Sequence, residues 1–460
     1  MIDRRTFLLT LAAAAAARPA LVRAGRGVGF GALQPDPQRI LDLPQGFHYS
    51  IVSQTGDAMD DGLVVPGQPD GMAAFPGKHG NTVLVRNHEI SSASSQPGPF
   101  GSGAALLPRV DTTNIYDRGK GATPGPGGTT TVTWNSSEQR TVKQHMSLIG
   151  TEVNCAGGQT PWGSWLSCEE CFEDAGRTFE YGRVVTRERR HGYVFEVSAS
   201  ADRALPPQPL KDMGRFEHEA AAVDINTGIV YLSEDRHRSL LYRYVPQVPG
   251  RLAAGGKLQA LVISGRPSFD TRNWGWRPDL LPGDQLPISW VDLPDADSAR
   301  NDLRFRGFDL GAARFARGEG LCFANGELVL TCTIGGSERL GQVFAVRPGR
   351  VGAQGEQEGE LRLVAESTVD SLLRNADNVT QSPWGDLVLC EDTAEHCGLV
   401  GLTANGKQYP LADNAYSPAE LTGICFSPDG SEMFVNVQQR GLTLAIRGPW
   451  DLAAAPTGKS

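Results

Sequence analysis

A thiol and two carboxylates lie close together in one glycine- and tryptophan-rich stretch, residues 150–170. Cys155 comes first, and after a Pro-Trp-Gly turn a short apolar run leads into Glu169 and Glu170. Such a hairpin would bring a soft thiolate and hard carboxylates together, a ligand mixture that suits iron or a mixed-metal centre better than zinc or magnesium alone. For one isolated cysteine, a buried structural thiol beside solvated acids is the simpler interpretation. Recurrence of the pattern along the chain favours the metal.

The recurring unit has three parts. A polar residue opens an apolar run, a glycine-containing turn follows, and a second apolar run ends in polar residues, which is typical of a β-hairpin. The copies open at six positions: Asp70, Cys155, Glu219, Glu319, Asp377 and Glu420.

Further apolar runs between the copies predict additional strand pairs, at residues 191–197, 240–245, 341–346 and 361–364. Two hairpins per unit give a four-stranded propeller blade. We therefore predict an all-β fold, a six-bladed β-propeller with loop insertions at residues 91–128 and 265–300. An irregular β-sandwich is the alternative.

In a propeller the innermost strands line a central channel, so the six opening residues should converge at one mouth. The ends of the second runs return to that mouth and add Asn87, Glu89, Glu170, Glu234, Asp235, Glu391 and Asp392. So many carboxylates need cations as compensation, and Ca²⁺ prefers oxygen ligands. Arg317, two residues before Glu319, would add a guanidinium, which together with a metal binds phosphoryl groups. His88 and His218 would either support the ligands or pack against the next blade.

The bulk composition is typical of a globular protein, and the first residues predict export. The chain has 460 residues, 40% hydrophobic and 21% charged, and a net charge of −9 without a basic block, which argues against nucleic-acid binding. Residues 1–24 carry Arg4-Arg5 and a short apolar run, and we read them as a twin-arginine signal peptide handled by the Tat translocase. Residues 25–460 would form one propeller domain, a monomer without a stable membrane anchor, in the periplasm or outside the cell. Among eight cysteines we expect one disulfide and otherwise buried thiols.

Several long motifs together resemble the PhoX family of exported bacterial alkaline phosphatases. They are residues 150–158 and 160–170, and also 86–89, 127–131, 214–219, 315–320, 426–430 and 434–438. The resemblance implies a six-bladed phosphatase that hydrolyses phosphate monoesters, and also diesters, with Fe³⁺ and Ca²⁺ around a bridging oxide as the nucleophile. It implies Cys155 as an iron ligand, Glu170, Glu219 and Glu319 as cluster ligands, and further ligands among Asp377, Glu391 and Asp392. Asn87 and Arg317 would contact the phosphate.

The sequence departs from that family in two ways and leaves two rival functions open. The chain is shorter than the larger relatives, and residues 340–375 contain no counterpart of a phosphate-contacting lysine. One rival is a non-catalytic propeller stabilised by calcium, and the other is a calcium-dependent lactonase. Neither rival gives Cys155 a role, so this thiol discriminates between them and the phosphatase.

Overall fold

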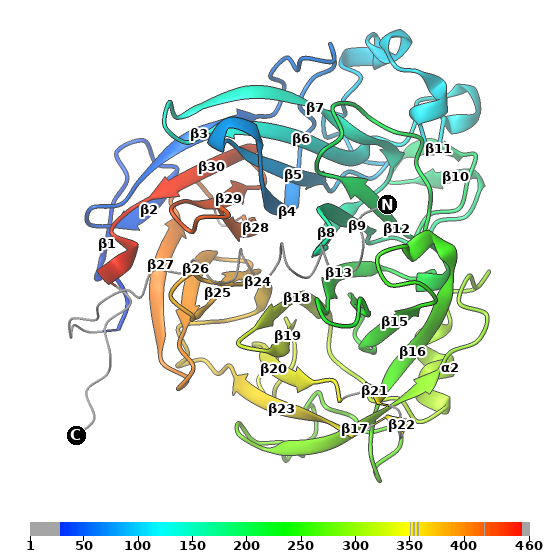
Figure 1. The fold of residues 1–460 in the computed structure, drawn as a ribbon, viewed down its shortest axis with the longest axis vertical. Helices are drawn as coiled ribbons and strands as arrows, with labels where there is room; N and C mark the ends of the chain where they lie inside the picture. Colours follow the sequence, from blue (N-terminus) through cyan, green and yellow to red (C-terminus); the bar gives the residue numbers. More distant parts are fainter. Residues whose placement is uncertain (1–27, 350, 353–354, 357, 418, 453–460) are drawn as a thin grey trace.

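The protein consists of antiparallel β-sheets arranged around a central axis, as in a β-propeller (Figure 1). The structure is a computed structural model that describes residues 28–460 except 350, 353–354, 357, 418 and 453–460. The all-β, propeller-like class predicted from the sequence is confirmed. The predicted signal peptide, residues 1–24, lies outside the described residues.

Every predicted hairpin of the repeat is present. In each pair the opening strand lies nearest the axis and is hydrogen-bonded to the second strand. The opening strands contact one another in a closed ring around the axis. These pairs are β4 (Pro69–Pro76) with β5 (Thr82–His88), β8 (Asn154–Gln159) with β9 (Ser164–Glu169), β13 (His218–Val223) with β14 (Val230–Glu234), β18 (Gly318–Ala324) with β19 (Glu327–Cys332), β24 (Ala376–Gln381) with β25 (Leu387–Glu391), and β28 (Leu421–Phe426) with β29 (Met433–Val437).

Outer strands extend these pairs toward the periphery. One long strand, β17, joins two of the extended sheets edge to edge through β16 and β23, so that they count as a single nine-stranded sheet. The outer strands are β6 (Gly127–Asn135), β7 (Arg140–Thr151), β12 (Val194–Ser198), β15 (Tyr242–Pro246), β16 (Gly256–Ile263), β17 (Gln285–Asp292), β20 (Gln342–Arg347), β23 (Gly359–Glu366), β26 (Gly398–Leu402), β27 (Gln408–Asn414) and β30 (Leu442–Arg447).

Strands from the start of the described chain close the array. Strand β3 (His48–Gln54) pairs with β30, the last strand of the chain, and β2 (Leu41–Pro44) pairs with β27. Strand β1 (Leu33–Gln34) extends β2. The first and last parts of the described chain are thereby held together by main-chain hydrogen bonds.

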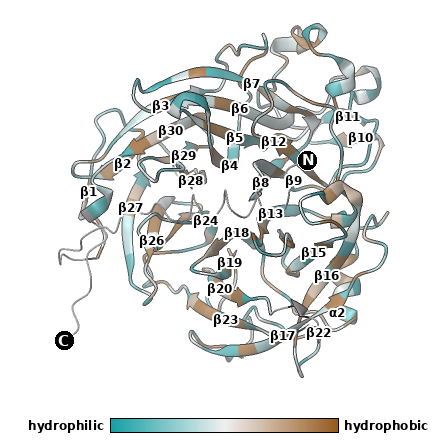
Figure 2. Cartoon of the chain, in the orientation of Figure 1, coloured by the Kyte–Doolittle hydropathy of each residue, from teal (hydrophilic) through white to brown (hydrophobic). Residues whose placement is uncertain are grey.

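The hydrophobic core lies between neighbouring sheets. Figure 2 shows hydrophobic segments along the strands, and one such layer contains Phe75, Trp165 and Phe195 from adjacent sheets. The predicted disulfide is wrong, because all eight cysteines are free. Six of them are buried, including Cys168, Cys332 and Cys390 on three different sheets, where the thiols act as small apolar side chains.

The remaining elements are short insertions. Residues 102–121 contain four 3-10 turns, and a hairpin formed by β10 (Gly176–Glu180) and β11 (Arg183–Arg187) follows β9. Other short elements are helix α2 (Leu303–Asp309), the small pair β21 (Val351–Gly352) and β22 (Gly355–Glu356), and the 3-10 turns Lys78–Gly80, Lys211–Met213, Leu252–Ala254 and Trp450–Leu452. Among the described residues, no helix has the length and apolar character needed to span a membrane.

Candidate metal centre

The opening strands share an irregularity that decides where the candidate ligands lie. A register shift, the mark of a β-bulge, follows the first residue pair of β4, β8, β13, β18 and β24. A bulge bends its strand and re-aims side chains at that point. The residues at the shift are Asp70, Cys155, Glu219, Glu319 and Asp377.

Backbone strain accompanies the bulges. Four of the candidate ligands are preceded, two residues earlier, by a residue with positive φ: Gln68 (45°), Val153 (48°), Arg317 (52°) and Asn375 (47°). Left-handed backbone is costly for a β-branched residue such as Val153. Main-chain hydrogen bonds hold it there, because its N–H donates to Ile90 and its carbonyl accepts from Glu170, at 3.1 and 2.8 Å. The strained turn is thus built into the entry to the Cys155 strand.

Glycines after two ligands allow the opening strands to approach each other. A Cβ on Gly71 would lie 2.5 Å from the Cα of Ala156, and one on Gly320 would lie 2.6 Å from the carbonyl oxygen of Asp377. Neither distance leaves room for a side chain. The close approach brings the ligand residues of neighbouring sheets together.

The sixth opening residue predicted from the sequence, Glu420, is wrong in register. It precedes β28, and the pairing of Leu421 with Val437 matches the pairing of Pro69 with His88 at the start of β4. The position equivalent to Asp70 is therefore Thr422, a residue without a carboxylate. Glu420 nevertheless lies close enough to the mouth that Asp70 and Asp377 act on its charge.

Side chains of the second strands bind the main chain of the next ligand residue. The Asn87 amide donates to the carbonyl oxygens of Cys155 and Ala156, at 2.9 and 2.7 Å. In the same way Ser233 donates to Glu319, Thr331 to Asp377 and Asn436 to Asp70, at 2.6–2.7 Å. Asn87 is fully buried, and its Oδ1 accepts from Trp165 and Ser167. In this structure Asn87 therefore holds the Cys155 strand in place.

Side chains at the end of each second strand alternate in direction, and this alternation separates the acids that reach the mouth from those that point away from it. Two residues after the position of Asn87 in each copy, the side chains reach the mouth: Glu89, Glu170, Asp235, Thr333, Asp392 and Gln438. The intervening residues point away from it. Among them Glu234 accepts hydrogen bonds from Tyr242 and Arg304.

Glu391 belongs to the set that points away. Its carboxylate accepts hydrogen bonds from the main-chain N–H groups of Arg374 and Gly398, at 2.8 and 3.2 Å. Its neighbour Asp392 instead faces Arg317, at 3.5 Å from Nη1. Of this predicted pair, the structure brings only Asp392 to the mouth.

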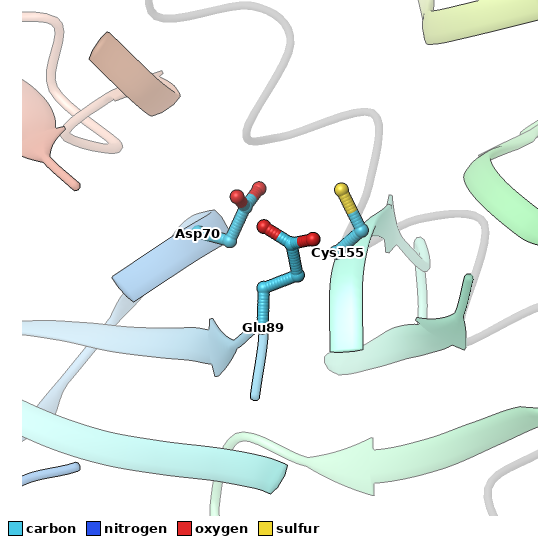
Figure 3. A group of neighbouring side chains, drawn as sticks. All are labelled: Asp70, Glu89 and Cys155. Carbon is cyan, nitrogen blue, oxygen red and sulfur yellow. The ribbon is translucent and has the colours of Figure 1, made fainter. Parts of the chain in front are cut away.

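Seven side chains form three overlapping groups, each with ligand atoms within 4.8 Å of one another. Cys155 belongs to two groups and Glu219 to two, so the groups form a continuous chain across the mouth. Figure 3 shows the first group, with the Glu89 carboxylate between Asp70 and the Cys155 thiol. The groups are Asp70, Glu89 and Cys155; Cys155, Glu170 and Glu219; and Glu219, Glu319 and Asp377.

The electrostatics of the cluster favour bound cations. Burial and the neighbouring carboxylates raise the pKa values of Glu89 and Asp377 to about 7, and they raise those of Glu170, Glu219 and Glu319 well above the ordinary value. The same causes raise the pKa of the Cys155 thiol. Bound cations would reverse this penalty, because they stabilise the deprotonated ligands. The donor set, oxygens around one sulfur, fits a mixed-metal site.

The positively charged side chain of Arg317 lies among the acids of the cluster. Its guanidinium donates to both oxygens of Asp235 at 2.8 Å and lies 3.0 Å from Glu319. Burial disfavours its charge, but Glu319, Asp235 and Asp392 raise the pKa above the ordinary value. The side chain keeps 28% exposure. The structure thus places the predicted guanidinium beside the candidate ligands.

The two histidines considered from the sequence pack inside the sheets. His88 contacts the carbonyl of Gly67 and the hydroxyl of Thr130, and both ring nitrogens are engaged. His218 stacks on Phe216, with ring centroids 3.6 Å apart. Burial lowers the pKa of His218 to about 3 and that of His88 well below its ordinary value, so both rings are neutral.

A buried network behind the ligands was not predicted from the sequence. Glu169 accepts hydrogen bonds from the main-chain N–H groups of Glu152, Gly192 and Tyr193, at 2.9–3.2 Å. His191 lies between Glu169 and Asp117, at 2.6 and 3.2 Å. The network anchors the loop before Cys155 from behind, and its members lie too far apart in the chain to form a local motif.

The channel below the ligands has a different character. It contains a cavity of about 390 Å³ whose lining includes small residues that directly follow the candidate ligands, namely Gly71, Ala156, Ala220 and Gly320. Among the described residues, its lining contains no carboxylate. The acidic chemistry is therefore confined to one end of the channel.

The family model for alkaline phosphatase PhoX matches residues 28–441 of this chain. The chain belongs to the PhoX family. The predicted resemblance is confirmed, and with it the assignment of the chain to a family of phosphatases. No match was found among curated protein sequences.

One solved structure shares this fold. PhoX from Pseudomonas fluorescens, solved in complex with vanadate, a transition-state analogue, has a TM-score of 0.68 and 18% identity, with 94% of this chain and 100% of that chain covered. A gluconolactonase from Xanthomonas campestris has a TM-score of 0.39 and 13% identity, with 93% and 100% of the two chains covered.

Proposed function

We propose that this PhoX-family chain hydrolyses phosphate monoesters, and also diesters, at a cluster of metal ions held by the mouth residues. The observation that carries the proposal is the chain of three ligand groups linked through Cys155 and Glu219. A thiol shared between two carboxylate groups has no role in a purely structural calcium site. The ligands would be Asp70, Glu89, Cys155, Glu170, Glu219, Glu319 and Asp377, with Asp392 beside them.

The metals we propose are Fe³⁺ and Ca²⁺. Cys155 is the soft donor that favours iron, and the carboxylates are the hard donors that favour calcium. When bound, such cations polarise a phosphoryl oxygen and neutralise the charge that develops in the transition state.

The protein's own residues would bind and orient the ester. Arg317 supplies the guanidinium for a phosphoryl oxygen, and Asp235 fixes its orientation through two hydrogen bonds. Its Nη1 has only a long contact of 3.5 Å to Asp392 and is the nitrogen we assign to the substrate. Asn87 contributes indirectly by holding the main chain of Cys155.

The finer predictions about the molecule stay proposals. One blade for each opening strand, β4, β8, β13, β18, β24 and β28, supports the count of six blades. Twin-arginine export, a periplasmic or extracellular location, a single domain over residues 25–460 and a monomeric state remain predictions from the sequence.

The test is a comparison of two thiol variants with the wild type. We expect Cys155→Ala to lose bound iron, because a ligand shared by two groups is removed. Its rate of p-nitrophenyl phosphate hydrolysis should fall by about three orders of magnitude. Cys322→Ala removes a thiol that lines the channel below the cluster and should keep both properties. Hydrolysis by Cys155→Ala at the wild-type rate would exclude the proposal. Calcium without iron in the purified protein would favour a binding propeller or a lactonase.

A further inference from the structure

The main chain of Arg236 lies next to that of Arg317 and carries a second guanidinium into this region. It directly follows Asp235, the residue that orients Arg317, and its carbonyl oxygen accepts a hydrogen bond from the main-chain N–H of Arg317 at 2.9 Å. The Arg236 side chain is 47% exposed, against 28% for Arg317. The two arginines are thus neighbours in space although 81 positions separate them in the numbering (317 − 236).

One end of the Arg236 guanidinium is anchored and the other end is free. Nη2 donates to Glu217, whose side chain is only 3% exposed and also accepts from Asn301 at 2.6 Å. Within the described part of the chain, Nε and Nη1 of Arg236 have no hydrogen-bond partner. In contrast, Nε and Nη2 of Arg317 are both occupied by carboxylates. Arg236 therefore offers the guanidinium with the greater number of unused donors.

The surroundings keep Arg236 charged and close to the ligand cluster. Partial burial disfavours the cation, but Glu217, Asp235 and Glu170 outweigh it and raise the pKa of Arg236. Glu170 is a candidate ligand shared with Cys155 and Glu219. Arg236 also directly follows Asp235, whose carboxylate holds Arg317 beside the cluster.

We propose that Arg236 is a second phosphate-binding residue, one that favours dianionic monoesters over monoanionic diesters. The inference rests on the proposed function and deepens it. A monoester presents one more anionic oxygen than a diester, and a second fork of N–H donors can bind it. In a diester that oxygen carries an organic group, so the contact with Arg236 is weakened. Arg236 would thus set substrate class as well as affinity.

The first measurement is binding of inorganic phosphate to the metal-loaded protein by calorimetry, which needs no turnover. We expect Arg236→Ala to weaken phosphate binding roughly 10- to 100-fold, as for the loss of a charged hydrogen bond. Arg236→Lys should be intermediate, because it keeps the charge without the fork. Arg238→Ala is the matched control. Arg238 lies in the same exposed loop, but its positive charge is felt by Arg314, whose pKa it lowers.

The second measurement is kcat/KM for p-nitrophenyl phosphate and for bis(p-nitrophenyl) phosphate. Arg236→Ala should lower the monoester value roughly 10- to 100-fold and the diester value by only about threefold. Glu217 keeps its bond to Asn301 and its ion pair with Arg304 in this variant, so the metal content should match the wild type, whereas loss of the Arg236 ion pair should lower the melting temperature moderately.

The outcomes separate the two proposals. Equal phosphate affinity in Arg236→Ala and Arg238→Ala would overturn the role of Arg236, and equal losses for the two esters would overturn its role in selection. Wild-type protein that binds phosphate but hydrolyses neither ester would overturn the proposed function alone, with the binding comparison still decisive for Arg236. Wild-type protein that binds no phosphate would overturn both.

Discussion

Asn87 is one member of a repeated contact between neighbouring hairpins. Like Ser233, Thr331 and Asn436, it binds the main-chain carbonyl of a candidate ligand position on the next opening strand. The repeated contact explains why a polar side chain is fully buried so close to the cluster. In this role Asn87 positions the Cys155 strand, which differs from the phosphate contact that the resemblance implies.

The role of Asn87 can be tested by its loss. Asn87→Ala would remove the side-chain partner of the Cys155 and Ala156 carbonyls and of the Trp165 indole N–H. We expect a loss of about 1–3 kcal/mol in the free energy of unfolding and a lower metal content, because unpaired buried groups are costly. Denaturation and metal analysis measure both. Normal stability and metal content with a raised KM would instead restore Asn87 as a phosphate contact.

His191 makes the stability of the mouth depend on pH. The ring lies between Asp117 and Glu169, with Glu152 at 4.0 Å and Tyr116 packed edge-on. Burial alone would disfavour its charge, but these carboxylates raise the pKa to about 10. Because the folded value exceeds the ordinary value of 6.5, the stabilisation is complete below about pH 6.5 and disappears as the pH rises toward 10.

We therefore expect the stability difference between wild type and His191→Gln to depend on pH. The difference in unfolding free energy should be largest and constant below pH 6.5, should shrink between pH 6.5 and about 10, and should be smallest above that range. Urea denaturation at several pH values measures it. Exposed His79 offers a control, since His79→Gln should show no such trend. A difference independent of pH would mean that His191 is neutral.

At the scale of elements, the β10–β11 hairpin supports the Cys155 loop through one buried arginine. Arg187 makes two hydrogen bonds to Glu152, at 2.8 and 2.9 Å, and two to Glu180. Its side chain is only 2% exposed. Glu152 lies three residues before Cys155, so the hairpin and the ligand strand share one ionic contact.

Arg187→Met should cost about 3–5 kcal/mol in unfolding free energy, because it leaves Glu152 charged and buried without its partner. Arg177→Met changes an exposed arginine on the opposite face of the same hairpin, and we expect an effect within about 0.5 kcal/mol. Chemical denaturation of the two variants gives the comparison. Similar small effects would show that the hairpin is independent of the Cys155 loop.

Local sequence patterns predict most of the candidate site. They fail where strand pairing determines which residue occupies a position at the mouth. The openers Asp70, Cys155, Glu219, Glu319 and Asp377 follow from the hairpin pattern, and strict alternation would also have chosen Asp392 over Glu391. The register of β28 depends on the bulge and not on composition, so the hairpin pattern predicts Glu420 where the structure has Thr422. Arg187 sits in a short polar hairpin without apolar periodicity and gives no signal in the sequence.

Closure of the whole molecule is likewise absent from any local pattern. Strand β3 pairs with β30 across almost the entire chain, and neither strand contains a signal for the other. The closure nevertheless fixes the ring of opening strands, and through them the distances between the ligands. The cluster is a property of the complete array.

Acids from separate sheets repel one another across the mouth, so bound cations should stabilise the whole molecule. We expect chelation to lower the melting temperature of the wild type by roughly 10 °C, since metal binding contributes folding free energy. Glu219→Gln removes a carboxylate shared by two ligand groups. It should be less stable than the wild type with metal and more stable than the wild type in chelator, because one repulsive charge is absent. Glu391→Gln, outside the cluster, should lose stability in both conditions, because its carboxylate holds two main-chain N–H groups. The assignment of Glu219 to the metal centre would be contradicted if Glu391→Gln were also more stable than the wild type in chelator, or if Glu219→Gln were not.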